Sequence, residues 1–140
     1  MPGDGSPEAA ALAWAWLGRA RDDLAVANMW ADERVAPSIA AFHAQQAAEK
    51  ALKSVLVATQ TEFPPTHVIG LLIQLCASSG KRVPDLVLRA VPLTRFAVRT
   101  RYPGLGSEIT AQEAGSAAVA AEHVVQWAVA TLSERSGGAP

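Results

Sequence analysis

The fold of this chain is decided by the stretch Phe42-His43-Ala44-Gln45-Gln46-Ala47-Ala48-Glu49-Lys50-Ala51-Leu52-Lys53. Side chains on a helix advance by about 100° per residue, so this stretch has two unlike faces. One face is almost pure alanine and consists of Ala40, Ala44, Ala47, Ala48, Ala51 and Ala58. The opposite face is polar and carries His43, Gln46, Lys50 and Lys53, with Gln45 and Glu49 at its edge. Because small side chains allow close approach, we expect another helix on the alanine face and treat this helix as the packing centre.

The segments on either side also have helical patterns. Their apolar residues recur at spacings of three and four, and none shows the alternation that is typical of a β-strand. The expected helices cover residues 8–30, 38–60, 67–77, 83–102 and 110–132. The sequence therefore predicts an all-α fold, an up-and-down bundle of four to five helices.

Several single residues indicate where these helices begin or break. Pro37 suits the first turn of the second helix, and Thr66 is expected to cap the third. Pro92 lies inside the fourth segment, where we expect a kink or two short helices. Thr110 and Glu113 have the spacing of a capping box, which would open the last helix.

The composition is that of one small globular domain. The chain has 140 residues, 50% of them hydrophobic, which is enough for a core without disulfides or metal. We expect a domain over 8–134 and disordered tails at 1–7 and 135–140. The single cysteine, Cys76, excludes an internal disulfide and is expected in the core. No apolar run is long enough for a membrane span, and the N-terminus lacks the basic segment of a signal peptide, so we expect a cytoplasmic protein.

Charge is unevenly distributed along the chain. The net charge of −1 gives no general argument for nucleic-acid binding. Six of the 12 basic residues nevertheless lie within 21 positions: Lys81, Arg82, Arg89, Arg95, Arg99 and Arg101. Arg95, Arg99 and Arg101, together with Tyr102, are candidates for phosphate contact and base stacking. The alternative is an ordinary exposed basic face.

The polar face of residues 42–53 is the second candidate site. His43, Gln46, Lys50 and Lys53 could form the floor of a cleft, with Glu49 orienting one lysine. The alternative is a solvated face whose Glu–Lys pairs contribute tenths of a kcal/mol each.

The remaining polar residues indicate little chemistry. None of the three histidines has a metal-ligand partner at helical spacing, so we expect neither a metal site nor a cofactor. His67 directly follows Thr66, where packing and capping in a first helical turn is the simpler interpretation. Asp22 and Asp23 are adjacent, would point about 100° apart on a helix and are not expected to share one site. No phosphate-binding glycine loop and no nucleophile elbow occurs.

Taken together, these residues resemble the HEPN domain family over roughly residues 12–132. The most specific part is residues 43–53. It is supported by Ala20-Arg21-Asp22-Asp23-Leu24 before it, by Pro65-Thr66-His67 after it, and by Arg101-Tyr102-Pro103 late in the chain. The resemblance implies a helical bundle, commonly a homodimer. It also implies a minimal nucleotidyltransferase as partner, often within a toxin–antitoxin pair, and an association with nucleotide binding.

Some members of this family are metal-independent ribonucleases that use an Arg followed a few residues later by a His. This sequence departs from that motif, because Gly106, Ser107 and Glu108 occupy the corresponding positions after Arg101. No arginine precedes any of the three histidines at that spacing either. Without the motif, RNA cleavage by the family's route is not expected, although His43 or His67 could substitute for the missing histidine in space.

Three hypotheses follow from the sequence. The first is a HEPN-like module that dimerises, binds a nucleotidyltransferase partner and contacts nucleotide or RNA through His43, Gln46, Lys50, Lys53, His67, Arg95, Arg99, Arg101 and Tyr102. The second is a ribonuclease toxin. The third is a purely structural dimer, in which the polar face is an internal hydrogen-bond network.

Overall fold

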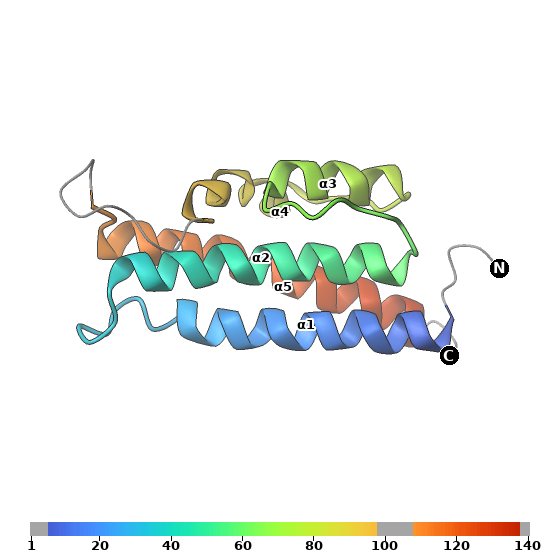
Figure 1. The fold of residues 1–140 in the computed structure, drawn as a ribbon, viewed down its shortest axis with the longest axis horizontal. Helices are drawn as coiled ribbons and strands as arrows, with labels where there is room; N and C mark the ends of the chain where they lie inside the picture. The colour runs from blue at the N-terminus through green and yellow to red at the C-terminus, as the bar shows by residue number, and fades with distance from the viewer. Residues whose placement is uncertain (1–5, 98–107, 138–140) are drawn as a thin grey trace.

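Three long helices and a smaller helical layer make up the fold. The computed structural model describes residues 6–97 and 108–137. The long helices are α1 (Pro7–Ala27), α2 (Pro37–Ala58) and α5 (Ala111–Gly137), and they lie side by side (Figure 1). The smaller layer consists of α3 (Ile69–Ser78), α4 (Asp85–Leu88) and the 3₁₀-helix η1 (Val91–Phe96). The described residues contain no strand, and the predicted all-α bundle is confirmed.

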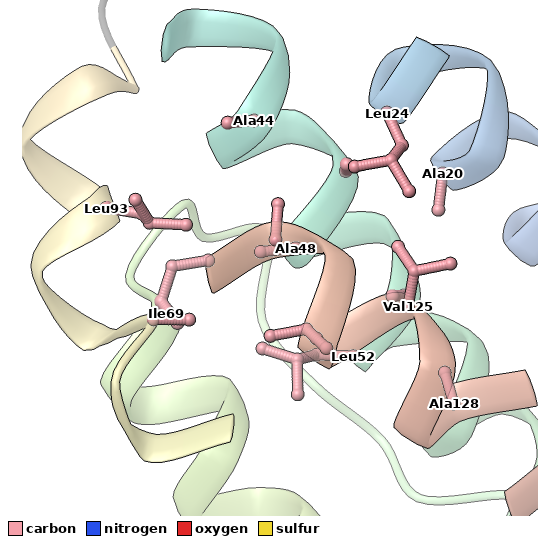
Figure 2. Close-up of a cluster of buried hydrophobic side chains, with 14 of the residues drawn as sticks. Ala20, Leu24, Ala44, Ala48, Leu52, Ile69, Leu93, Val125 and Ala128 are labelled. Carbon is pink, nitrogen blue, oxygen red and sulfur yellow. The ribbon is translucent and has the colours of Figure 1, made fainter. Parts of the chain in front are cut away.

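Helix α2 is the packing centre, as its sequence predicts. It contacts α1, α3, η1 and α5. All six alanines of its small face are buried. In Figure 2, Ala44, Ala48 and Leu52 of α2 lie in one cluster with Ile69 of α3, Leu93 of η1 and Val125 of α5. Because alanine side chains are short, neighbouring helices can approach the α2 backbone, and the larger side chains of those neighbours fill the core.

The segment after α2 differs from the prediction. Helix α3 begins at Ile69 rather than at residue 67, and Val68 occupies its N-cap position. Thr66 accepts the backbone N–H of Val68 instead of capping the helix. One contact is consistent with the later start: the carbonyl of His67 accepts a hydrogen bond from the Gln45 side chain.

Most other predicted boundaries hold within a few residues. Helix α1 ends at Ala27, before the predicted end at Trp30, and α5 continues past Leu132 to Gly137. Pro37 lies at the start of α2. The predicted break around Pro92 is confirmed, because α4 and η1 are two short helices. Residues 98–102 of that segment lie outside the described residues.

The helix ends use local hydrogen bonds. Ser6 accepts the N–H of Ala9 at the start of α1. The capping box of α5 is confirmed: the Thr110 hydroxyl accepts the Glu113 N–H at 3.0 Å, and the Glu113 carboxylate accepts the Thr110 N–H at 2.9 Å. These bonds satisfy N–H groups that have no partner within the helix.

Cys76 lies in the core, as expected. Its side chain is fully buried in α3, and burial raises the pKa of its thiol to about 12. The thiol therefore stays protonated at neutral pH and packs as a small apolar group. Among the described helices, none is both long and apolar enough to span a membrane.

Candidate functional site

The polar face of α2 is tied to α1 through a buried carboxylate. Asp23 of α1 places Oδ1 2.8 Å from Nδ1 of His43 and Oδ2 2.6 Å from Nζ of Lys50. The Asp23 side chain is only 11% exposed. An ionised carboxylate can only accept hydrogen bonds, so this geometry assigns a proton to Nδ1 of His43. Nε2 is then the ring nitrogen that does not contact Asp23. We call Asp23, His43 and Lys50 the Asp23 network.

A second carboxylate on α2 is held in the same way. Glu49 receives Nζ of Lys53 on Oε2 at 2.8 Å, and Oε1 lies 2.8 Å from Nδ1 of His67. Gln45 donates to the same Oε1 at 3.0 Å, and Gln46 donates to Gln45. We call these five residues the Glu49 network. Each of the two networks therefore joins one carboxylate to one lysine and one histidine.

The charge of Glu49 is stabilised by its partners. Burial alone would raise the pKa of this carboxyl group, because a charge loses hydration in the interior. Hydrogen bonds from Lys53, Gln45 and His67 outweigh that effect and hold the pKa of Glu49 below its ordinary value. Glu49 is therefore ionised at neutral pH and compensates the Lys53 charge.

Lys53 is buried, although its sequence position predicted an exposed polar face. Its side chain is 9% exposed, and Nζ lies 5.8 Å from the ring centroids of both Trp16 and Phe63. The two aromatic faces and Glu49 replace the water that would hydrate the ammonium group. Gln45 is likewise fully buried rather than at the edge of a solvated face. The inward half of this face is thus an internal network.

His43 and His67 differ in accessibility. The His43 side chain is 23% exposed and meets the Phe42 ring edge-on at a centroid distance of 5.3 Å. The His67 side chain is 66% exposed, even though Nδ1 contacts the buried Glu49. His67 precedes α3 and is not part of its first turn. A carboxylate that orients Nδ1 is an arrangement that suits an imidazole for acid–base chemistry at Nε2.

Asp23 was not among the sequence-predicted site residues. The expectation that Asp22 and Asp23 diverge is confirmed, since Asp22 is exposed and Asp23 is buried. Only the packing of α1 on α2 brings Asp23 opposite His43 and Lys50. Two sequence signals pointed to Asp23: it lies beside Leu24 and three residues after Ala20, at the border of the apolar stripe, and it belongs to the segment of residues 20–24 that supports the family resemblance.

Arg95 belongs to a separate surface. Its guanidinium pairs with Glu113 of α5 at 3.1 Å and lies 4.3 Å from the Phe96 ring centroid. Hydrogen bonds from the Thr110 backbone, and then from Arg95, hold the pKa of Glu113 below its ordinary value. Between η1 and α5 lies a hollow whose lining includes Arg89, Arg95, Phe96, Thr110, Gln112 and Ser116. We call this the η1–α5 hollow.

The predicted site residues therefore form two groups. His43, Gln46, Lys50, Lys53 and His67 belong to the two networks around α2. Arg95 contacts α5 instead, and Arg99, Arg101 and Tyr102 lie outside the described residues. Across residues 6–97 and 108–137, no group of three histidine, cysteine or acidic side chains is arranged to hold a metal ion.

Comparison with known proteins agrees with this architecture. No protein with a curated description matches the chain, and neither does any solved structure. The family model described as HEPN domain matches residues 13–133, which is most of the chain and includes both networks and the η1–α5 hollow. The chain belongs to the HEPN domain family.

Proposed function

We propose that the protein is a HEPN module that forms a homodimer, binds a minimal nucleotidyltransferase and contacts nucleotide or RNA phosphate, as one half of a toxin–antitoxin-type system. The observation that carries the phosphate contact is the η1–α5 hollow. Two arginines line it, Arg89 and Arg95, beside hydroxyl and amide groups of α5. Stacking on Phe96 and pairing with Glu113 hold the Arg95 guanidinium in place, which reduces the entropy lost when it binds an anion.

Arg99, Arg101 and Tyr102 follow η1 in the sequence, and we assign them to the same phosphate contact. Exposed apolar side chains of α4 and η1 support a protein partner on the neighbouring surface: Leu86, Leu88 and Val91 are each more than 40% exposed. The two α2 networks stabilise the helical bundle, because they hold α1 and the segment before α3 against α2.

Charge reversal tests the phosphate contact. The variant Arg89→Glu/Arg95→Glu is expected to weaken binding of single-stranded RNA, and wild-type binding is expected to weaken as salt rises, because phosphate contacts release counterions. The variant Arg21→Glu reverses the charge of one arginine on α1 and serves as the control. Unchanged RNA binding and unchanged copurification of a nucleotidyltransferase in the double variant, and in Arg99→Glu/Arg101→Glu, would contradict the proposal.

A ribonuclease is the second candidate, and one observation favours it. His43 and His67 each present Nδ1 to a buried carboxylate, which leaves Nε2 for proton transfer. This function predicts growth arrest on expression, relieved by His43→Ala or by replacing Arg101. Harmless expression together with intact total RNA would exclude it.

The structural alternative predicts instead that Gln46→Ala and Lys50→Ala lower the melting temperature and change nothing else.

A further inference from the structure

An acidic side chain, Glu113, lies inside the η1–α5 hollow. It lines the hollow together with Arg89 and Arg95, and no other acid occurs among the described residues of that lining. Its carboxylate has two partners there. Oε1 accepts the backbone N–H of Thr110 at 2.9 Å, and Oε2 accepts Nη2 of Arg95 at 3.1 Å. One of the two guanidinium groups to which we assign phosphate is therefore already paired with a negative charge.

The contact between Arg95 and Glu113 is open to solvent. The Arg95 side chain is 55% exposed, and that of Glu113 is 38% exposed. Exposed ion pairs are weak, so an incoming anion can replace the carboxylate without the penalty that breaking a buried pair would carry. The guanidinium keeps its position in the exchange, because it also lies over the Phe96 ring at 4.3 Å from the centroid. The pair is thus suited to the exchange of one anion for another.

The capping box holds Glu113 near the hollow after such an exchange. Oε1 stays on the Thr110 N–H, and the Glu113 N–H stays on the Thr110 hydroxyl. The hydrogen bond from the Thr110 backbone is also the main reason that the pKa of Glu113 lies below its ordinary value, ahead of Arg95. A displaced Glu113 therefore remains ionised at neutral pH and repels the anion that displaced it.

Arg89 has no such competitor among the described residues. None of their carboxylates lies within ion-pair distance of it. Asp85, one helical turn earlier, and Glu108, just before α5, are both exposed, but neither lines the hollow. The two arginines are therefore unequal. An anion gains a new partner at Arg89, whereas at Arg95 it takes the place of a carboxylate.

We propose that Glu113 is a built-in competitor of the ligand for Arg95 and thereby determines how tightly the η1–α5 hollow binds phosphate. The inference rests on the proposed function in taking phosphate as the ligand of this hollow. It adds that the hollow binds more weakly than its two arginines alone would, and that one carboxylate, held by the cap of α5, is the cause.

Fluorescence anisotropy of the full chain with a labelled single-stranded RNA oligonucleotide tests the competition. Glu113→Gln removes the charge and keeps an oxygen for the Thr110 N–H, since glutamine also serves at this position of a capping box. The variant is expected to bind the RNA about fivefold more tightly, which is the upper end of what an exposed ion pair contributes. Glu122→Gln makes the same charge change farther along α5 and is expected to leave the affinity unchanged. Circular dichroism melting checks that both variants stay folded.

The same substitution in two arginine variants identifies how Glu113 acts. In an Arg95→Gln background, Glu113→Gln is expected to change RNA affinity by less than about twofold, because the shared partner is gone. In an Arg89→Gln background the full gain is expected, because Arg89 does not pair with Glu113. Equal gains in the two backgrounds would overturn the inference, since the carboxylate would then act by general repulsion of the RNA.

The outcomes keep this inference apart from the proposed function. RNA binding that Arg89→Glu/Arg95→Glu weakens but Glu113→Gln leaves unchanged would support the phosphate contact and contradict the inference. Tighter binding in Glu113→Gln without any effect of the arginine changes would contradict both, and so would no effect of either variant. If the wild type binds no RNA, binding gained in Glu113→Gln would support the inference and contradict the phosphate contact of the wild type. No binding by either protein would contradict both.

Discussion

Oε1 of Glu49 lies 2.8 Å from Nδ1 of His67, although the two residues are 18 positions apart in the chain. The contact joins the middle of α2 to the segment that leads into α3. The other carboxylate oxygen of Glu49 receives the buried Lys53 ammonium. One acidic side chain therefore compensates an internal charge and fixes a connecting segment at the same time.

Replacing Glu49 is expected to destabilise the fold strongly. In Glu49→Gln the Lys53 charge stays buried without its counter-charge, and breaking such a pair from one side costs about 3–5 kcal/mol. Urea unfolding followed by circular dichroism measures this change. Asp32→Asn removes the exposed ion pair with Arg34 and is expected to leave the midpoint of urea unfolding nearly unchanged. Equal effects of the two substitutions would mean that Glu49 does not compensate Lys53.

The contribution of Glu49 to stability is expected to decrease in acid. Its pKa in the folded protein lies below the ordinary value of 4.5, so as pH falls the unfolded chain takes up the proton first. The contribution is therefore complete above the ordinary pKa and is lost as pH falls through the folded pKa. The difference in unfolding free energy between wild type and Glu49→Gln should shrink as the pH falls below about 4.5. A difference that grows below this pH would contradict the direction of the pKa shift.

The two helix ends at Gln60 and Gly80 provide a matched pair of substitutions. Gln60 has a φ of 53°. Its backbone N–H donates to the carbonyl of Val57, and the N–H of Thr61 donates to the carbonyl of Leu56. Gly80 has a φ of 95° after α3 and ends that helix in the same pattern. Left-handed backbone costs a residue with a side chain about 1 kcal/mol relative to glycine. Gln60→Gly should therefore stabilise the protein and Gly80→Ala should destabilise it, each by about that amount in chemical denaturation. Changes of the same sign at both positions would show that side-chain contacts outweigh the backbone preference.

Trp30 packs directly on the backbone of α5. A Cβ atom added at Gly115 would lie 3.0 Å from two atoms of the Trp30 indole. Gly115→Ala is expected to destabilise the protein, because overpacking costs about 1–3 kcal/mol and a mid-helix Gly→Ala change gains at most about 1 kcal/mol. Thermal unfolding checks this result.

The control for Gly115 is Gly18 on α1, where an added Cβ meets nothing within 4 Å. Gly18→Ala should raise the melting temperature. In a Trp30→Leu background the Gly115→Ala change should lose most of its cost, because the close neighbour is gone. A cost that persists in that background would place the clash elsewhere.

The sequence by itself determined the helical segments and some of their ends, although the end of α1 and the start of α3 differ from the prediction. Periodicity gives the buried alanine face of α2, because the angle between side chains is fixed by the helix alone. The capping box of Thr110 and Glu113 and the break around Pro92 also follow from residues close together in the chain. The resemblance carried by residues 43–53 predicted the family that the match over residues 13–133 confirms.

The tertiary structure alone decided which polar residues are internal. The helix positions of Lys53 and Gln45 predict a polar surface. Lys53 is instead covered by Trp16 of α1 and by Phe63, and Gln45 by His67 of the connecting segment. Asp23 became the partner of His43 and Lys50 only when α1 packed against α2. Helical periodicity specifies the direction of a side chain relative to its own axis, whereas burial and charge pairing depend on which distant segment lies in that direction.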